Sequence, residues 1–310
     1  MKIAMMGSGG IGGYYGGLLA RAGHDVTFIA RGAHLAALRA HGLRVKSVHG
    51  DFTIAPVRAT DTPAGVGPVD LVVICVKTPD TDQAAHAIEP MVGPNTTVMS
   101  LQNGIDAAER IGAVVGREHV IGGVTWISSA IEGPGVIRQI SQFRHIVSGE
   151  LDGRITPRVQ AIVGTFESTG VTVELADDIL KTLWTKFVFI ASISGVGSLT
   201  RLEIGDYRDV PETRALLESL MREVEAVARA DGVLLDTDMV EQALAIVDEA
   251  APNIEPSMQR DVKAGRRSEL ESMIGVVGRK GRELEVPTPI VDVVYAALLP
   301  AELKARSGSA

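Results

Sequence analysis

The amino-acid sequence predicts an α/β protein in which a doubly wound, mostly parallel sheet is followed by an all-α domain. In the first half, short apolar runs alternate with helix-like segments, which is typical of parallel strands with helices on both faces of the sheet. After Asp177, strand-like segments largely stop. A chain of 310 residues is long enough for two domains. The change in composition predicts their boundary, with one domain over 1–175 and the other over 176–310.

The elements of the first half follow from apolar runs, helical spacing and glycine punctuation. The expected strands are 2–7, 25–30, 69–77, 96–103 and 120–129, with a hairpin of 43–48 and 51–57, and the expected helices are 11–23, 33–42 and 81–92. Further along, 135–140 and 144–151 are expected to be antiparallel strands, followed by a helix over 158–170. The helices expected in the second half are 177–200, 211–232, 236–251 and 269–286.

The composition is that of a globular protein and limits the class of partner. Hydrophobic residues make up 45% of the chain, charged residues 22%, and the formal net charge is −8. An acidic chain is a poor candidate for binding nucleic acid or an anionic membrane, although a local basic pocket for a small anion is compatible with it. We therefore expect a small-molecule partner, no nucleic acid and no membrane. A homodimer is compatible with the sequence, which does not specify the oligomeric state.

The chain shows no strong targeting signal. The glycines between Gly7 and Gly13 interrupt the first apolar stretch before it reaches the length of a secretion signal. No uninterrupted apolar run reaches the ~18 residues of a membrane span, so we expect a cytoplasmic protein. Cys75 is the only cysteine and lies within the run LVVICV, which favours a buried thiol over a reactive one. No metal site is expected.

The turn after the first strand carries the pattern G-x-G-x-x-G at Gly7, Gly9 and Gly12. The first glycine permits a tight turn, the second lets the backbone approach a pyrophosphate, and the third lets helix and strand pack closely. The N-terminus of the following helix presents N–H donors and the positive end of a dipole to an anion. The turn, including Gly10 and Ile11, is therefore a predicted dinucleotide site. A tight turn without a ligand is the alternative.

Arg31 follows the second strand, at the place where an acid often holds the adenosine ribose of NAD. An arginine offers a planar fork of donors to a 2′-phosphate instead. This predicts NADP(H) as the cofactor, whereas a solvated surface arginine is the alternative. Lys77 ends the strand 69–77 at the edge where ligands bind in such sheets. It is a second candidate for the same phosphate, or else a solvated cation.

Asn103 ends the next strand, within SLQNG. Its amide is a candidate contact for the nicotinamide ribose or for the substrate, although Gln102, Asn103 and Gly104 are also typical of a plain turn. In the second half, Lys186 interrupts the apolar stretch LWTKFVFIASIS. A lysine there is unfavourable unless it faces a cleft, where desolvation would lower its pKa toward that of a useful proton donor. Glu269 follows KAGRRS and is a second ionisable candidate for the site. The alternative is that it pairs with Arg266 or Lys263 on a solvated face.

Over nearly its full length the chain resembles the ketopantoate reductase family (2-dehydropantoate 2-reductases). The matching pieces, in family order, are GSGGIGGYYGGLLARAGHDVTFIAR, VKTPDT, LQNGI, LWTKF, PSMQRDVKAGRRSELESMIGVVGRKG and VPTP. The resemblance implies an N-terminal Rossmann domain, a helical C-terminal domain and a catalytic cleft between them. It also implies NADPH-dependent reduction of a 2-keto acid to a 2-hydroxy acid, on the route to pantothenate.

The resemblance also implies roles for individual residues. It assigns Lys186 as the catalytic lysine, Glu269 as the acid that pairs with the substrate and with this lysine, and Ser257 as a contact of the substrate carboxylate. Asn103 matches the amide near the nicotinamide and the substrate. Asp261 lies in the same motif as Glu269, and we interpret it as structural. The glycine turn, Arg31 and Lys77 match the pyrophosphate and 2′-phosphate contacts.

One departure from the family pattern concerns the helix that carries the lysine. The family often places asparagines four and eight residues after the lysine, where this chain has Ile190 and Ser194. Positions 186, 190 and 194 share one helix face, so Ile190 and Ser194 are expected at the substrate. Loss of one polar partner of a buried ligand group typically costs about 1–3 kcal/mol. The sequence therefore predicts a reductase, most readily of 2-dehydropantoate. A more apolar keto substrate and a non-catalytic NADP-binding sensor are the alternatives.

Overall fold

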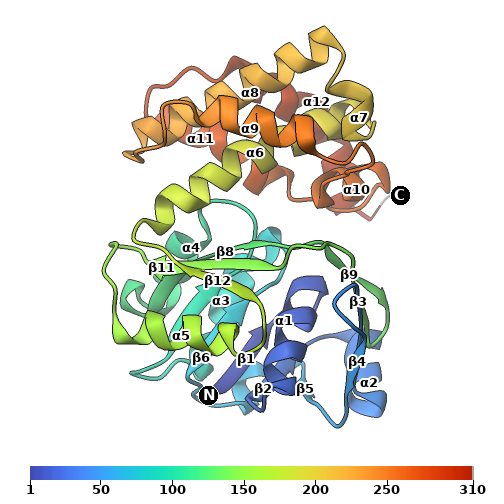
Figure 1. Ribbon diagram of the computed structural model, residues 1–310, viewed down its shortest axis with the longest axis vertical. Coiled ribbons are helices and arrows are strands. Elements are labelled where there is room, and N and C mark those ends of the chain that lie inside the picture. The colour runs from blue at the N-terminus through green and yellow to red at the C-terminus, as the bar shows by residue number, and fades with distance from the viewer. Residues whose placement is uncertain (309–310) are drawn as a thin grey trace. The chain divides into compact units, whose positions relative to one another are not determined.

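The computed structural model describes residues 1–308, which form two compact units (Figure 1). Unit 1 consists of Met1–Gln102 and Ala107–Ile179. Unit 2 consists of the short segment Asn103–Asp106 and the chain from Leu180 onward. A short segment that begins three residues after Ser100, the last residue of a strand of unit 1, is therefore part of unit 2.

Unit 1 contains twelve strands in two sheets. The strands are β1 (Lys2–Met6), β2 (Asp25–Ile29), β3 (Leu43–Ser47), β4 (Phe52–Ile54), β5 (Arg58–Thr60), β6 (Leu71–Ile74), β7 (Thr97–Ser100), β8 (Val120–Trp126), β9 (Ser129–Gly133), β10 (Val136–Gln139), β11 (His145–Glu150) and β12 (Thr172–Leu175). The larger sheet has the order β12-β11-β8-β7-β6-β1-β2-β5, and the smaller sheet the order β4-β3-β10-β9.

The larger sheet is parallel except for one neighbouring pair, β8 and β11. Helices α1 (Gly10–Arg21) and α5 (Pro157–Glu167) pack with Leu71 and Val73 of β6, whereas α3 (Thr81–Ile88) and α4 (Ala107–Val115) pack with Val72 and Ile74. Because successive side chains of a strand point to opposite faces, helices cover both faces of this sheet. Helix α2 (Gly32–His41) completes unit 1. The predicted doubly wound, mostly parallel fold is confirmed.

The strands expected at 135–140 and 144–151 both exist, but they do not pair with each other. β10 lies in the smaller sheet, antiparallel to β9 and parallel to β3, whereas β11 lies in the larger sheet, antiparallel to β8. The expected hairpin is confirmed, because β3 and β4 pair in antiparallel register. Alternation of apolar residues predicts strands but not their partners, which explains the wrong pairing.

Helix α1 lies against both sheets, and its glycines allow close packing on both contacts (Figure 1). A Cβ atom at Gly16 would lie 2.7 Å from side-chain atoms of Met5 in β1 and Phe28 in β2. A Cβ atom at Gly13 would lie 2.7 Å from the side chain of Ile137 in β10. The helix therefore needs small residues on more than one face, which accounts for the run GIGGYYGG.

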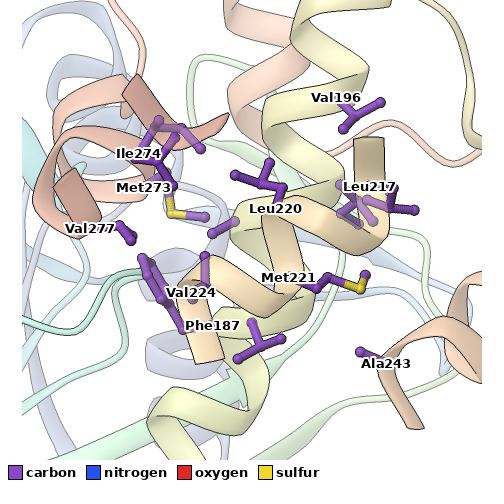
Figure 2. Close-up of a cluster of buried hydrophobic side chains, with 14 of the residues drawn as sticks. Phe187, Val196, Leu217, Leu220, Met221, Val224, Ala243, Met273, Ile274 and Val277 are labelled. Atoms are coloured by element: carbon purple, nitrogen blue, oxygen red, sulfur yellow. The ribbon is translucent and has the colours of Figure 1, made fainter. Parts of the chain in front are cut away.

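Within its described residues, unit 2 has helices and connecting loops and no strand. Its helices are α6 (Ile179–Thr200, whose first residue belongs to unit 1), α7 (Ile204–Tyr207), α8 (Pro211–Ala230), α9 (Met239–Glu249), α10 (Ser257–Lys263), α11 (Val276–Glu283) and α12 (Pro289–Arg306), with a π-helical turn at Glu271–Gly275. Figure 2 shows part of its core, in which Phe187 of α6, Leu220 and Val224 of α8, and Met273 of the π-helical turn gather. The expected helix over 269–286 is thus divided into a π-helical turn and α11.

Helix α6 runs through this core. By length and composition it is the one helix in residues 1–308 that is apolar enough to cross a membrane. More than half of its most apolar window, 56%, is buried within the structure. Because a core helix passes the same test, this is weak evidence for a membrane span.

Candidate active site

The glycines of the turn between β1 and α1 differ in how much space surrounds them. Gly7 has a φ of +95°, a conformation that favours glycine. A Cβ atom at Gly12 would lie 2.1 Å from the carbonyl oxygen of Gly7, so the start of α1 lies directly on the turn. A Cβ atom at Gly9 would meet no atom within 4 Å. The backbone at Gly9 thus faces open space at the N-terminus of α1, while Gly7 and Gly12 are required by the fold.

Gly10 is restricted by a neighbour that the sequence does not reveal. A Cβ atom there would lie 2.4 Å from the carbonyl oxygen of Ser129, in β9 of the smaller sheet. Ile11, the next residue of α1, packs against the core of unit 1. Both residues are therefore accounted for by packing, and Gly9 is the most open of the four glycines.

Arg31 is exposed and immediately precedes α2. No hydrogen bond or ion pair within the described residues involves its guanidinium group. The backbone N–H and the side chain of Ser8 in the glycine turn both donate to the carbonyl oxygen of Ile29, at 3.0 and 3.1 Å. These two bonds connect the turn to the end of β2, two residues before Arg31. The backbone therefore brings an exposed cation and the glycine turn to the same strand end.

Lys77 and Cys75 follow β6, at the carboxyl edge of the sheet. Lys77 is exposed and caps the short helical turn Thr78–Asp80. Cys75 is partly buried, and a Cβ atom at Gly12 would lie 3.1 Å from its Cβ. Burial raises the pKa of the Cys75 thiol, which agrees with a packing role rather than a reactive one.

Asn103 and Lys186 meet within unit 2. The Nζ atom of Lys186 donates a hydrogen bond of 2.9 Å to Oδ1 of Asn103. Asn103 precedes Gly104, whose φ is +100°, and Ile105, which packs against the core of this unit. The segment Asn103–Asp106 therefore enters the helical unit and brings the amide to the middle of α6. A plain turn would not account for this contact of the Asn103 side chain.

The charge state of Lys186 depends on its surroundings. Burial lowers the pKa of its ammonium group from 10.5 to about 8, and the Glu269 carboxylate opposes part of this decrease. Desolvation disfavours the charged form of a lysine, while a nearby negative charge favours it. A side chain with this pKa exchanges protons near neutral pH far more readily than an ordinary lysine.

Glu269 is a buried residue, with only 7% of its surface exposed. The solvated pairing with Lys263 or Arg266 considered from the sequence is wrong, because Lys263 pairs with Glu255 and Arg266 pairs with Asp261. Arg266 bonds to the Asp261 side chain through two nitrogens, and its backbone N–H donates to the Asp261 carbonyl at 2.9 Å. Asp261 thus closes the loop after α10, as its interpretation as structural requires.

Three further residues considered from the sequence lie on α6 and α10. Ile190 is partly buried against the core of unit 2, and Ser194 is buried with 1% of its surface exposed. Ser257 is exposed and is the first residue of α10, after Pro256. No contact among the described residues connects Ser257 to Lys186.

The π-helical turn that begins two residues after Glu269 is a feature that the sequence analysis missed. Such turns are rare in proteins, and many of those that occur lie at functional sites. The segment before and within the turn is held by side chains of α12, namely Glu302 and Tyr295. No residue pattern in the sequence distinguishes this turn from the expected regular helix.

Comparison with known families covers both units. The model of the family described as "Ketopantoate reductase PanE/ApbA" matches residues 3–153. The model described as "Ketopantoate reductase PanE/ApbA C terminal" matches residues 178–302. Together these two matches span most of the chain.

Individual relatives match over nearly their whole length. A 2-dehydropantoate 2-reductase of Mesorhizobium japonicum is 31% identical over 317 residues, which cover 96% of each chain. An uncharacterized oxidoreductase of Bacillus subtilis, YkpB, is 29% identical over 300 residues, covering 96% of this chain and 98% of its own. A PanE/ApbA family ketopantoate reductase structure from Ralstonia eutropha superposes with a TM-score of 0.91 at 34% identity, covering 99% of this chain and all of the other. The chain therefore belongs to the ketopantoate reductase family, whose members are oxidoreductases.

Proposed function

We propose that this protein reduces a small 2-keto acid to the 2-hydroxy acid with NADPH, and that 2-dehydropantoate is its substrate. The observation that carries the proposal is the contact of Lys186 with Asn103 beside the buried Glu269. Family membership and the activity named for several relatives support the choice of substrate. The product, pantoate, would place the enzyme in pantothenate biosynthesis in the cytoplasm.

The residues of unit 1 fit a dinucleotide phosphate. Gly9 leaves open space at the N-terminus of α1, where backbone N–H groups and the helix dipole favour an anion. Arg31 is exposed beside this turn, and Lys77 is exposed at the same edge of the sheet. We assign the pyrophosphate to the turn from Gly7 to Gly12, and the 2′-phosphate to Arg31 and Lys77. When bound, NADPH supplies the hydride that reduces the keto group.

Lys186 is assigned as the proton donor to the carbonyl oxygen. With a pKa of about 8, most of its population carries the proton at pH 7, yet it releases this proton more easily than an ordinary lysine. Efficient general acids have a pKa near the working pH. Asn103 directs the ammonium group through its amide oxygen, and Glu269 maintains its charge. Asn103 is also assigned a contact to the nicotinamide ribose.

The remaining candidate residues are assigned to the polar and apolar ends of the substrate. Ser257 would donate its hydroxyl hydrogen to the substrate carboxylate, and Ser194 would contribute a second hydroxyl from α6. Glu269 would accept a hydrogen bond from the substrate hydroxyl. Ile190 contributes only apolar surface, one turn after Lys186.

This apolar surface favours a second candidate function, the reduction of a keto acid with a plain alkyl side chain. The amide that the family pattern places at this position would hydrogen-bond a polar substrate group, whereas an isoleucine contacts methyl groups. The chemistry of Lys186 and Glu269 is the same in both cases. Only the preferred substrate differs.

The test is the rate of NADPH oxidation with a panel of 2-keto acids that includes 2-dehydropantoate, 2-ketoisovalerate and phenylpyruvate. We expect 2-dehydropantoate to have the highest kcat/KM, and Lys186→Ala to lower kcat for every substrate by about 10²–10⁴-fold. A higher kcat/KM for 2-ketoisovalerate would favour the second candidate. Tight NADPH binding without reduction of any keto acid would contradict both and leave a binding protein.

A further inference from the structure

Glu302 of α12 is a buried acid whose carboxylate is held by three donors. It has 3% of its surface exposed. Its Oε2 atom accepts hydrogen bonds from the backbone N–H of Ser268 at 2.9 Å and from the Ser268 hydroxyl at 2.6 Å. Its Oε1 atom accepts from Nε of Arg306, one turn later in the helix, at 2.8 Å. A buried carboxylate is unfavourable unless it is paired and hydrogen-bonded, and both oxygens of Glu302 are.

These bonds act on the residue next to Glu269. Ser268 precedes Glu269 directly, and its hydroxyl oxygen also accepts a bond of 3.3 Å from the backbone N–H of Leu270. Two residues after Glu269, the Glu271 carboxylate accepts a bond of 2.8 Å from the Tyr295 hydroxyl, again from α12. Side chains of one helix therefore bond to residues on both sides of Glu269, to the backbone N–H and hydroxyl of Ser268 before it and to the carboxylate of Glu271 after it.

The Glu302 carboxylate has more donors than the carboxylate of an ordinary surface ion pair needs. Arg306 alone would satisfy the charge of Glu302, as in the i, i+4 pairs of α8. Instead, two of the three donors come from Ser268, which is itself fully buried. Hydrogen bonds to a charged acceptor are shorter and stronger than neutral ones, so this contact defines the path of the chain at Ser268 more rigidly than packing alone.

We propose that Glu302 is a positioning residue that holds Ser268 so that the adjacent Glu269 carboxylate faces Lys186. The predicted effect of Glu302 on turnover rests on the proposed function. Its predicted effect on the position of Glu269 does not. Glu302 acts through Ser268 and touches neither the substrate nor Lys186.

The direct test follows the charge of Lys186. Competitive acetylation of the intact protein with acetic anhydride at a series of pH values, read by mass spectrometry of the peptide that contains Lys186, gives the midpoint of its titration. Burial and the Glu269 charge are the causes of the shifted pKa of this lysine. A lower midpoint in Glu302→Gln therefore reports that the Glu269 charge has moved away, because a loss of burial would raise the midpoint instead.

We expect a midpoint near 8 in the native protein and a lower midpoint in Glu302→Gln, by up to about one pH unit, because an acid that faces away no longer favours the ammonium form. Glu225→Gln is the matched control. Glu225 pairs with Arg229 at i, i+4 in α8, and neither contacts residues 268–271 in the described part of the chain. Its midpoint should equal that of the native protein.

Ser268→Ala provides a second, milder variant that removes one of the two donors. It should lower the midpoint in the same direction, and the double variant should lower it no further than Glu302→Gln alone, since the two residues act as one unit. If Glu302→Gln fails to fold, as judged by circular dichroism, Ser268→Ala decides the question. An unchanged midpoint in a folded variant would overturn the proposal.

Turnover supplies the second arm. With the best 2-keto acid, Glu302→Gln should lose roughly tenfold or more in kcat/KM at unchanged NADPH affinity, because misplacement of a reacting group by about 1 Å can cost a hundredfold. A native protein that reduces no keto acid would contradict the proposed function, yet the acetylation midpoints would still test the position of Glu269. Shifted midpoints without any loss of kcat/KM in an active enzyme would overturn the role of Glu302 in catalysis.

Discussion

The Nζ atom of Lys186 donates a hydrogen bond of 2.9 Å to Oδ1 of Asn103, a residue 83 positions earlier in the chain. This bond joins the middle of α6 to a four-residue segment that leaves unit 1 and enters the core of unit 2. An ammonium group on a flexible side chain has many orientations, and a fixed acceptor reduces them. The pair therefore gives an ammonium group of lowered pKa a fixed direction, and the following predictions test the proton-donor role that we propose for it.

Replacement of the lysine tests its catalytic role. In Lys186→Ala we expect kcat for the best 2-keto acid to fall by about 10²–10⁴-fold, the usual contribution of a general acid, with an unchanged dissociation constant for NADPH. The control is Lys181→Ala, which removes a partly exposed lysine of the same helix that pairs with Asp236. That variant should turn over normally. Near-native kcat in Lys186→Ala would exclude Lys186 as the acid.

The pH dependence of turnover follows from the pKa of Lys186. The group must carry the proton that it donates, and its pKa is lowered to about 8. As the pH rises through 8, the protonated fraction falls, so kcat/KM should decrease about tenfold per unit above this value. The decrease should be absent from the residual rate of Lys186→Ala. A profile that stays flat up to pH 10 would contradict this assignment.

The neighbouring amide allows the same pKa to be moved in a known direction. Asn103→Asp places a carboxylate at hydrogen-bond distance from the ammonium group, and an opposite charge this close raises the pKa of a lysine by about 1–3 units. The decrease in kcat/KM should move to higher pH by a similar amount. Asn103→Ala is the uncharged control and should lower kcat/KM with a much smaller change in the pH at which it decreases. Equal profiles for the two variants would show that Asn103 is not beside Lys186 in solution.

Arg31 tests the choice of cofactor. The native protein should bind NADPH more tightly than NADH, and Arg31→Ala should remove most of the difference. A charge-assisted contact of ~1.5–3 kcal/mol corresponds to roughly ten- to a hundredfold in affinity. Arg44→Ala, which removes an exposed arginine of β3, is the control and should retain the preference. Titration of cofactor fluorescence gives the six dissociation constants, for two cofactors and three proteins. Equal values for NADPH and NADH in the native protein would contradict the prediction.

Ile190 tests the substrate. Ile190→Asn should shift the ratio of kcat/KM for 2-dehydropantoate over 2-ketoisovalerate toward 2-dehydropantoate, by about tenfold if one hydrogen bond worth ~1.4 kcal/mol is gained. Both ratios come from NADPH oxidation under identical conditions. If Ile190 points only into the core of unit 2, the variant will lose stability without a change of ratio. A native preference for 2-dehydropantoate that Ile190→Asn leaves unchanged would likewise show that residue 190 does not select the substrate.

Local pattern was sufficient for much of the fold. Alternation of strands and helices predicted the doubly wound sheet, because the two periodicities are visible within about ten residues of sequence. The spacing of Gly7, Gly9 and Gly12 predicted a tight turn and close helix packing, and the structure shows both at Gly7 and Gly12. Lys186 stood out because a single charge interrupts a long apolar run. These features depend on neighbours in sequence, so the sequence by itself determined them.

Contacts between distant segments were decided only by the tertiary structure. The strands at 135–140 and 144–151 belong to different sheets, and apolar alternation carries no information on which strands become hydrogen-bond partners. Glu269 follows a basic segment typical of a solvated face, yet it is buried, next to a serine whose N–H and hydroxyl donate to Glu302. Likewise, the bond between Asn103 and Lys186 joins residues 83 positions apart, in a segment whose Ile105 packs against the core of unit 2. Burial and electrostatic pairing are properties of the assembled chain, and they determine the charge of Lys186.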